Sequence, residues 1–413
     1  MNGGSNKDFV RYNTGAMDSN LFLMGMQNSW FQYRAWEVIS DKVRDIKKKT
    51  ITDNLSFGGE VSIEFDKIAT LLEDVKVDTT ISALTPSGTG TYARFCDFLG
   101  IALYPNIYVS YASNSVQKYN SISLFCKHLR DSTRKDGNIY DEQLAGKLTP
   151  AQRNTRATAP QTVRTYLKPY WYKLAGHCPI LTALANKLKI TMNFANLQDV
   201  VQTDYTGGAS ASIQKVEFIY DVLNVTGTER DQFAETTFTP EGMSYLFEET
   251  HSVVNYKIPA GSTDFKVPLT QFVLPWSTGY GFFQKYADVN TLNAKKPFEF
   301  SISDLALITE ARLQDGDVGN FEVLYGTKDS ADRYAKKNVC SFFKVPHLFF
   351  TVSEAADIKN ANFGSFNASN INDFSVYLKF ANALAEDYSF SLVLFEHNWI
   401  NHQRGEIQKI FAV

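Results

Sequence analysis

Histidine is the commonest metal ligand in proteins, and this chain of 413 residues holds six. His397 and His402 stand five apart in the segment HNWINH. Two ligands on one helix face need a spacing of about three or four residues, and two on one strand face need about two. A spacing of five satisfies neither, and His177-Cys178 has no matching pair elsewhere. We therefore expect no metal site.

Acidic residues could also perform chemistry, and Glu248-Glu249-Thr250-His251 places two of them near a histidine. This segment lacks the His-Glu-x-x-His order that puts two zinc ligands one helical turn apart. There is no Gly-x-Ser-x-Gly elbow and no phosphate-binding glycine motif, and Gly88-Thr89-Gly90 predicts only a loop. A carboxylate pair could still cleave glycosides, but spatial separation decides that activity. We expect no catalytic residue and no cofactor.

Length and composition indicate a globular chain of two domains. The aromatic fraction of 14% favours β-structure. The formal net charge of −3 lacks the positive surplus of a protein that coats nucleic acid, so we expect no direct nucleic-acid partner. The four cysteines show no CxxC spacing, and the sequence shows neither a signal peptide nor a long apolar run. We expect a soluble protein with free thiols, made in a cytoplasm.

Alternating apolar residues predict strands along most of the chain. Val61, Ile63 and Phe65 alternate with polar residues, which is typical of a half-buried strand. The same criterion predicts strands at 75–81, 107–111, 166–171, 188–194, 253–256, 264–269, 271–274, 298–302, 306–313, 321–324, 348–352, 376–380 and 390–395. Short helices are predicted at 142–148 and 181–188. Short strands separated by turn signals suggest sandwiches or barrels.

The segment 216–251 is interpreted as the joint between two similar β-domains. An alternating apolar run begins at Val216, a charged elbow follows, and β-like patterning resumes at Tyr245. The elbow contains Glu229, Arg230 and Asp231. A strand, an elbow and a second strand at the middle of the chain divide it into two halves of comparable length.

Three segments depart from this pattern. Residues 1–35 predict an arm that packs under its own domain or attaches to a neighbouring subunit. Residues 127–165 carry eight Lys/Arg against four acids and predict a long polar loop that builds a subunit interface. The run 41–49, with Lys47–Lys49, predicts a solvated face, and contact with an anionic surface is the alternative.

Ordered motifs over nearly the whole chain resemble the double jelly-roll major capsid proteins of nucleocytoplasmic large double-stranded DNA viruses. The matching segments run from an opening pair of glycines to a Gly-Ser motif near the end. They are Gly3-Gly4, Gly15-Ala16-Met17-Asp18, Leu23-Met24-Gly25, Ser29-Trp30-Phe31, Tyr33-Arg34, Phe57-Gly58-Gly59, Asp221-Val222-Leu223, Glu229-Arg230-Asp231-Gln232-Phe233-Ala234, Tyr245-Leu246, Phe349-Phe350-Thr351-Val352 and Gly364-Ser365-Phe366-Asn367-Ala368-Ser369.

The resemblance implies an all-β fold of two consecutive eight-stranded antiparallel jelly rolls, with an N-terminal arm and short helices in loops. The expected division is an arm at 1–35, a first jelly roll at 36–225 and a second at 226–413. The residues expected to fix the elbow between the lobes are Glu229, Arg230, Asp231 and Phe233. The residues expected to make subunit contacts from the arm are Met24, Met26, Trp30, Phe31 and Tyr33.

The resemblance also implies a structural role without catalysis. The chain is expected to form a homotrimer, which would serve as a pseudo-hexagonal capsomer in an icosahedral virion shell. Expected partners are neighbouring trimers, penton and minor capsid proteins, and an internal membrane, with assembly in the host cytoplasm. The alternatives are a non-virion scaffold on the same fold and a carbohydrate-binding or carbohydrate-active β-sandwich.

Overall fold

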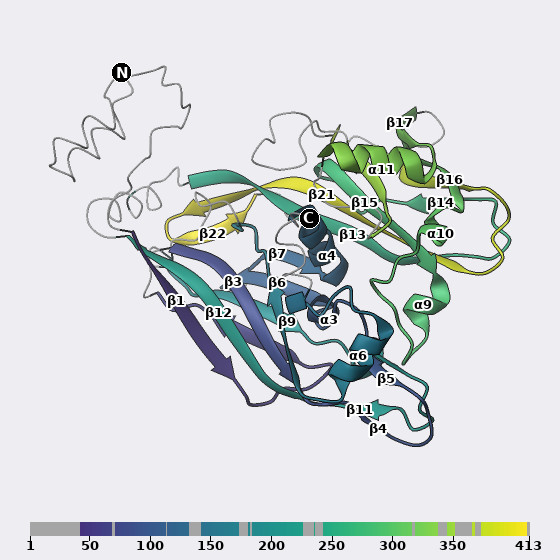
Figure 1. Ribbon diagram of the computed structural model, residues 1–413. Coiled ribbons are helices and arrows are strands. Elements are labelled where there is room, and N and C mark those ends of the chain that lie inside the picture. The colour runs from purple at the N-terminus through teal and green to yellow at the C-terminus, as the bar shows by residue number, and fades with distance from the viewer. Residues whose placement is uncertain are drawn as a thin grey trace, which may run out of the picture.

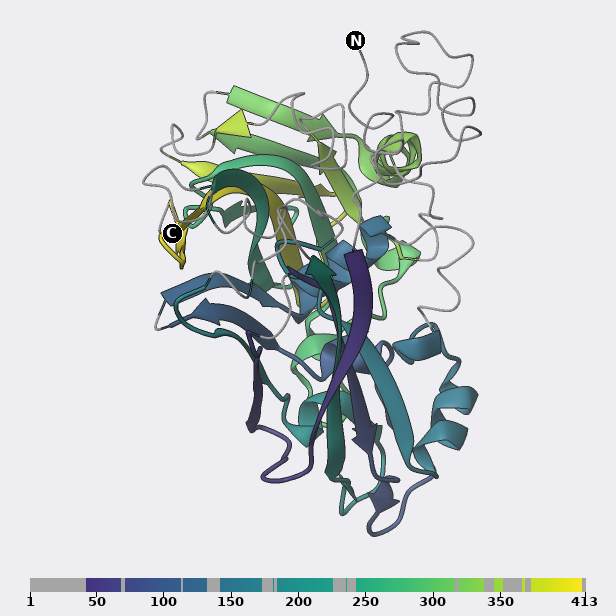
Figure 2. The same cartoon turned by 90° about the vertical axis from the view of Figure 1, so that its left-hand side faces the viewer.

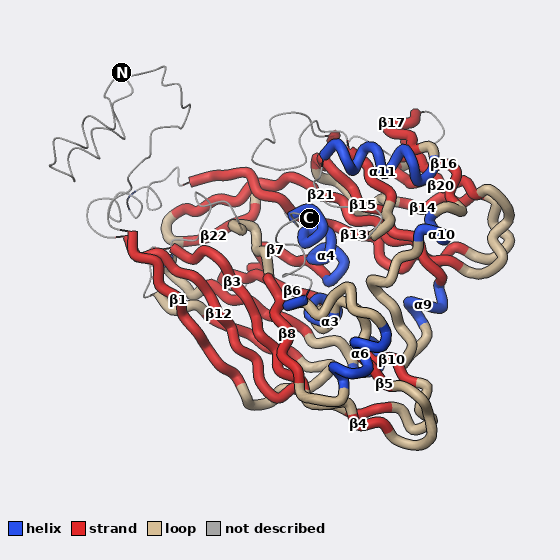
Figure 3. The backbone as a smooth tube through the Cα atoms, viewed as in Figure 1, coloured by secondary structure: helices blue, strands red, loops and turns tan. Residues whose placement is uncertain are grey.

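The computed structural model places four large antiparallel sheets in two lobes (Figure 1). Figure 2 shows the first lobe below the second, and Figure 3 shows that strands dominate both. The structure describes residues 42–67, 71–112, 114–131, 142–172, 181, 184–225, 235, 243–315, 319–337, 345–351, 366–367 and 373–410.

The first lobe contains two four-stranded sheets. One has the order β1-β12-β3-β8, with bounds Lys42–Ile51, Ile213–Val225, Leu71–Ile81 and Gln161–Tyr166. The other has the order β2-β9-β6-β7, with bounds Glu60–Glu64, Leu188–Asn193, Asn106–Tyr111 and Asn114–Asn120. Two small ribbons pair β4 (Thr85–Pro86) with β11 (Ala209–Ser210) and β5 (Ala93–Phe95) with β10 (Val201–Thr203).

The second lobe repeats this arrangement. One sheet has the order β13-β21-β15-β18, with bounds Met243–Ile258, Tyr388–Gln403, Pro275–Lys285 and Leu348–Thr351. The other has the order β14-β20-β16-β17, with bounds Asp264–Pro268, Phe374–Phe380, Ile308–Asp315 and Gly319–Leu324. The short strands β19 (Phe366–Asn367) and β22 (Glu406–Lys409) pair with β15 and β21.

The two lobes share one topology. When the eight main strands of each lobe are numbered along the chain, the two sheets have the orders 1-8-3-6 and 2-7-4-5 in both lobes. Eight antiparallel strands in this order form a jelly roll, which is a sandwich of two Greek keys. The predicted fold of two consecutive jelly rolls is therefore confirmed.

Half-buried strands appear where alternation predicted them. In β3 the buried residues Val75 and Val77 face the sandwich interior, while Lys76 and Asp78 lie on the outer face. The strand β13 is longer than expected, because it joins the predicted starts near 245 and 253 into 16 residues. A bulge between Val253 and Tyr256 interrupts its pairing with β21.

The charged run 41–49 proves to contain most of β1, a strand that the charge pattern obscured. β1 is the edge strand of its sheet, and Ile46 on it is 64% exposed. Lysines suit such a position because they discourage pairing with another sheet edge. The expected solvated surface is present, but it belongs to a strand.

Several helices lie in the connections. They are α3 (Leu99–Ala102), α4 (Ser121–Asp131), α6 (Pro150–Ala157), α7 (Leu197–Val200), α9 (Tyr286–Asn290), α10 (Ile302–Leu305) and α11 (Gly326–Lys337). None of the helices in the described residues is long and apolar enough to span a membrane.

The prediction of one long polar loop at 127–165 is wrong, because the described part of this region contains the end of α4, all of α6 and most of β8. α6 begins with a capping box, in which the Thr149 hydroxyl accepts from the Gln152 backbone N–H and the Gln152 side chain accepts from the Thr149 backbone N–H. Of the predicted helix at 142–148, Glu142 and Gln143 are helical and the chain turns at Leu144 and Ala145. Of the predicted helix at 181–188, the described residues 184–187 are irregular and Leu188 begins β9. The predicted strands at 271–274 and 298–302 are also wrong, because these segments pack as irregular chain. Of the predicted strand at 166–171, only Tyr166 lies in a strand, because β8 ends there.

Candidate functional site: the junction between the two lobes

The two jelly rolls meet over a junction that holds one lobe against the other. From the first lobe, α4, β7 and the β10 ribbon contribute to it. From the second lobe come β13, β21 and the segment 293–300. α4 lies between the lobes in Figures 1 and 2. Contacts at this junction fix the angle between the two lobes, so the junction is the candidate functional site.

Phe125 of α4 inserts into an aromatic cluster of the second lobe. Its ring stacks on Phe298 with centroids 4.6 Å apart, and it lies 6.0 Å from both Phe282 and Phe300. Phe98 of the first lobe meets Phe125 edge-on at 5.0 Å. Such pairs contribute about 0.5–1.5 kcal/mol each beyond the burial of their area. The cluster therefore joins the cores of the two lobes.

α4 is positioned for this role by its sequence, SISLFCKHLRD. Asn120 precedes the helix, and its side-chain oxygen accepts a hydrogen bond from the Ser123 backbone N–H at 3.0 Å. Residues 122–129 of the helix are all buried, including the polar Ser123, Lys127 and His128. α4 therefore fills the space between the lobes rather than covering a surface.

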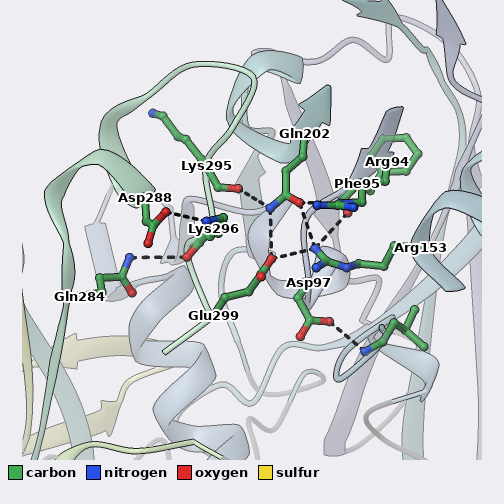
Figure 4. A network of polar contacts seen from close by, with 11 residues as sticks. Arg94, Phe95, Asp97, Arg153, Gln202, Gln284, Asp288, Lys295, Lys296 and Glu299 are labelled. Carbon is green, nitrogen blue, oxygen red and sulfur yellow. Dashed lines mark hydrogen bonds and ion pairs between the residues drawn. The ribbon is translucent and has the colours of Figure 1, made fainter. Parts of the chain in front are cut away.

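A polar network centred on Arg153 crosses the junction (Figure 4). Arg153 on α6 is 5% exposed, and its Nη1 donates to Glu299 Oε1 of the second lobe at 2.8 Å. Gln202 Oε1 accepts from Arg153 Nη1 at 3.2 Å and from Arg94 Nε at 2.9 Å. Gln202 Nε2 in turn donates to Glu299 Oε1 at 3.1 Å and to the Lys295 carbonyl at 2.9 Å. The buried guanidinium is thus paired with a carboxylate of the other lobe.

The segment 293–295, which lies beside this network, is also bonded to the first lobe. The Thr203 N–H donates to the Asn293 carbonyl at 2.8 Å, and the Asn293 N–H donates to the Gln198 carbonyl at 3.0 Å. Lys295 Nζ lies 2.7 Å from Asp199 Oδ1. Asn293 has a φ of 60°, a left-handed conformation that asparagine tolerates better than most residues. Residues 293–295 therefore form a strap, a short segment of the second lobe that is bonded to the first across the junction.

A third contact covers the edge of β13. Gln117 Nε2 on β7 donates to the Glu248 carbonyl at 3.3 Å, and Asn120 Nδ2 donates to Ser252 Oγ at 2.6 Å. Arg130 Nη1 of α4 donates to Glu248 Oε2 at 2.6 Å. Covering an edge strand prevents its unpaired backbone groups from recruiting another chain. The first lobe therefore protects the second from edge-to-edge pairing.

Behind this edge lies a buried polar ladder between β13 and β21. His251 Nδ1 is hydrogen-bonded to Glu396 Oε2, and Glu249 stands directly opposite Glu396 in the strand register. Glu249 also accepts from Lys409 Nζ and from Asn398 Nδ2, each at 2.9 Å. Burial raises the pKa of Glu396. Burial alone would lower the pKa of His251, but the hydrogen bond and charge of Glu396 raise it above its usual value.

The histidines singled out from the sequence lie on opposite faces of β21. His402 Nε2 is 3.4 Å from the Tyr170 hydroxyl of the first lobe, and His397 stands opposite Glu248 in the register. Burial lowers the pKa of His397. A separation of five residues divides the two side chains between the faces of the strand.

The predicted elbow and arm residues lie outside the described residues. They are Glu229, Arg230, Asp231, Phe233, Met24, Met26, Trp30, Phe31 and Tyr33. The predicted boundary between residues 225 and 226 also adjoins this undescribed part, so the division stays a prediction. Among the described contacts that join the lobes are those of Phe125, Arg153 and Glu299, none of which was a predicted site residue.

Two jelly rolls of identical strand order in one chain define the class of double jelly-roll proteins. A search of family models found no match, and a search of curated proteins found none either. Solved structures do match. VP54 of the virus PBCV-1, fitted into a reconstruction of the virophage Sputnik, superposes with a TM-score of 0.72 and 14% identity, covering 94% of this chain and 100% of that one.

Two further structures extend the likeness. A chain of the PBCV-1 virus capsid superposes with a TM-score of 0.70 and 13% identity, covering 94% of this chain and all of that one. The Faustovirus major capsid protein gives 0.65 and 10% identity, covering 97% and 98%. The chain therefore has the double jelly-roll fold of major capsid proteins of large DNA viruses.

Proposed function

We propose that this chain is a structural major capsid protein whose trimers are the capsomers of an icosahedral shell. The observation that carries the proposal is the repeated jelly roll, with the same strand order in both lobes. Three such chains around a threefold axis present six similar lobes, and six lobes fill a nearly hexagonal tile. Full-length likeness to a viral capsid chain and to a major capsid protein supports this role.

The junction supports the same proposal from physical grounds. A tile keeps its shape only if each chain holds its lobes at one angle. The aromatic cluster around Phe125 and the buried Arg153–Glu299 pair supply such a rigid connection. Interfaces within a permanent trimer bury about 2,000–5,000 Å², whereas contacts between capsomers need to be weaker and more polar.

The proposed partners are the chain itself, neighbouring trimers, and penton and minor capsid proteins, in a virion assembled in the host cytoplasm. An internal membrane is a further proposed partner of Lys47–Lys49. Lys47 pairs with Asp45, and Lys48 Nζ lies 2.8 Å from Glu217 Oε1. These ion pairs neutralise part of the positive charge of the lysines, so we expect their binding to an anionic membrane to be weak.

We propose a role without catalysis. Carboxylates of the junction are engaged in ion pairs or hydrogen bonds, such as Glu248 with Arg130 and Glu249 with Lys409. This arrangement serves structure, because a charged pair buried between lobes fixes their relative position. A glycosidase would instead require two carboxyl groups facing a substrate cleft.

The test is the oligomeric state and outline of the purified protein. Native mass measurement is expected to give three times the chain mass of 46.5 kDa, and negative-stain microscopy is expected to show a pseudo-hexagonal particle. A monomer that binds or cleaves glycans would overturn the proposal in favour of a carbohydrate-specific sandwich. A trimer that is absent from purified virions would favour a scaffold protein on the same fold.

A further inference from the structure

A cleft of about 630 Å³ opens between the lobes where β7 meets β13 and β22. Its lining comes from both jelly rolls, with Lys118 from the first lobe and His251 and Ser252 from the second. A volume of this size lies within the range of small-molecule sites. The capsid role assigns no ligand to this space.

Two of the acceptor side chains that line the cleft, Glu249 and Asn120, are already used within the protein. Both carboxylate oxygens of Glu249 accept hydrogen bonds, one from Lys409 and one from Asn398. The side-chain oxygen of Asn120 accepts from the Ser123 backbone N–H at the start of α4. The oxygens of these two side chains are therefore already occupied by protein donors.

Donors remain on the same walls. Lys118 is exposed, and its ammonium lies 5.5 Å from the centroid of the Tyr108 ring, an interaction that leaves its N–H groups available. The Ser252 hydroxyl accepts from Asn120 and so retains its own proton to donate. His251 uses Nδ1 for Glu396, while a quarter of its side chain stays exposed at the cleft.

Two buried hydroxyls and a helix end reinforce this donor surface. Ser123 and Thr250 line the cleft and are 1% and 3% exposed, and neither Ser123 Oγ nor Thr250 Oγ1 has a hydrogen-bond partner in the described part of the chain. α4 begins beside them at Ser121, and an N-terminus of a helix of 11 residues carries partial positive charge. Hydroxyls and helix ends of this kind commonly hold anions.

We propose that this cleft is an oxyanion site, which binds a phosphate or sulfate group of a small molecule between the two lobes. Lys118 supplies the positive charge, Ser252 and His251 donate from the opposite wall, and the start of α4 closes the inner end. A ligand held in this way contacts both lobes at once. Binding therefore stabilises their relative position and with it the shape of the chain.

Proton uptake at His251 should strengthen binding. The hydrogen bond to Glu396 raises the pKa of His251 despite its burial, so the charged ring persists to higher pH than in a free histidine. The charged and titratable groups around this ring are Glu249 on β13, Glu396 on β21, Lys409 on β22, and Lys118 and Tyr119 on β7. Above the pKa of His251 the cleft loses one positive charge next to two carboxylates, and affinity for an anion falls.

The experiment measures sulfate binding by calorimetry and thermal unfolding with the full chain, at matched ionic strength in sodium chloride. Sulfate keeps a constant charge over the pH range used, so any pH dependence belongs to the protein. We expect saturable binding with a Kd of about 1 mM, weakened about tenfold in Lys118→Gln, which loses a charge-assisted hydrogen bond. Binding should also weaken by at least about fivefold between pH 6 and pH 8.5, and this pH dependence should disappear in His251→Gln.

The matched control is Lys187→Gln, which removes an exposed lysine paired with Asp66 away from the cleft. It should leave the affinity for sulfate unchanged. Equal binding by Lys118→Gln and the control would overturn the site, as would sulfate affinity no greater than that of chloride. Acetate serves as a second probe, and tighter binding of acetate than of sulfate would contradict the assignment to a phosphate or sulfate group. The trimer test above is independent of these measurements, so either proposal can fail alone.

Discussion

Arg153 Nη1 of the first jelly roll lies 2.8 Å from Glu299 Oε1 of the second, and the guanidinium side chain is only 4% exposed. The pair connects α6 to a segment more than a hundred residues further along the chain. Its position between the lobes makes it a determinant of their angle. Because a buried ion pair costs desolvation energy, its geometry and supporting hydrogen bonds decide whether it stabilises the fold.

Removing one partner of this pair should destabilise the chain strongly. We expect Glu299→Gln to lower the free energy of unfolding by about 3 kcal/mol, because it removes the carboxylate that pairs with the buried Arg153 guanidinium. The double variant Arg153→Met with Glu299→Leu should recover most of the loss, since apolar groups of similar volume need no partner. Denaturant unfolding followed by fluorescence measures both values.

The control for this prediction is the exposed pair of Lys187 and Asp66, whose N and O atoms are 2.8 Å apart. Lys187→Gln should change stability by less than about 1 kcal/mol, because solvent screens an exposed ion pair. A loss in Glu299→Gln no larger than in this control would show that the junction pair contributes nothing specific.

Phe125→Ala should separate the lobes more than it unfolds either of them. Truncating this buried ring costs about 3–5 kcal/mol and leaves a cavity among Phe282, Phe298 and Phe300. Hydrogen exchange should accelerate in α4 and at residues 293–300, where the two lobes touch. Phe65→Ala, a buried ring within the first jelly roll, is the matched control. Similar exchange at residues 293–300 in both variants would rule out a special role for Phe125.

Asp97 should make the junction weaker at neutral pH than at acid pH. Burial raises the pKa of this carboxyl to about 6, although it accepts a hydrogen bond from the Leu148 N–H at 3.2 Å. A folded pKa above the unfolded value of about 3.9 means that the native state binds the proton more tightly. The stability supplied by the protonated form is complete below about pH 4 and is lost as the pH rises through about 6.

Asp97→Asn tests this dependence, because the amide cannot ionise and its oxygen can still accept from Leu148. The variant should be more stable than the wild type at pH 8 by about 2 kcal/mol and nearly equal to it at pH 4. Thermal unfolding across this range supplies the comparison. If the stability difference between the variant and the wild type were the same at every pH, Asp97 would not be the source of the pH dependence.

The sequence predicted the fold far better than the site, for physical reasons. Strand alternation follows from one buried face, so residues such as Val75 and Val77 reveal their strand locally. The charged β1 was missed because its side chains lie at a solvated sheet edge, where alternation of apolar residues is absent. The aromatic residues Phe298 and Phe300 favoured a strand prediction, but their burial is decided by α4, which is distant in the sequence.

The junction residues could not be selected from the sequence, because their importance depends on the partner each one meets. Arg153 lies in a stretch with many basic residues, and nothing local distinguishes it from exposed neighbours. Its pairing with Glu299 arises only when the two jelly rolls dock. The charged elbow at Glu229 and Arg230 had a visible pattern in the sequence, and its contribution to the lobe angle stays a prediction.

Asn293 offers a final test that links backbone geometry to assembly. Its φ of 60° suits asparagine and glycine, whereas a β-branched residue is strained there by about 1–3 kcal/mol. Asn293→Val should therefore distort the strap formed with Gln198 and Thr203, and with it the angle between the lobes. We expect the variant to fold but to yield fewer trimers in native mass measurements, because mismatched lobes no longer close a threefold ring. Asn293→Gly removes the same side chain without strain and should form trimers as the wild type does. Equal trimer yields in the valine and glycine variants would show that the strap does not set the shape of the tile.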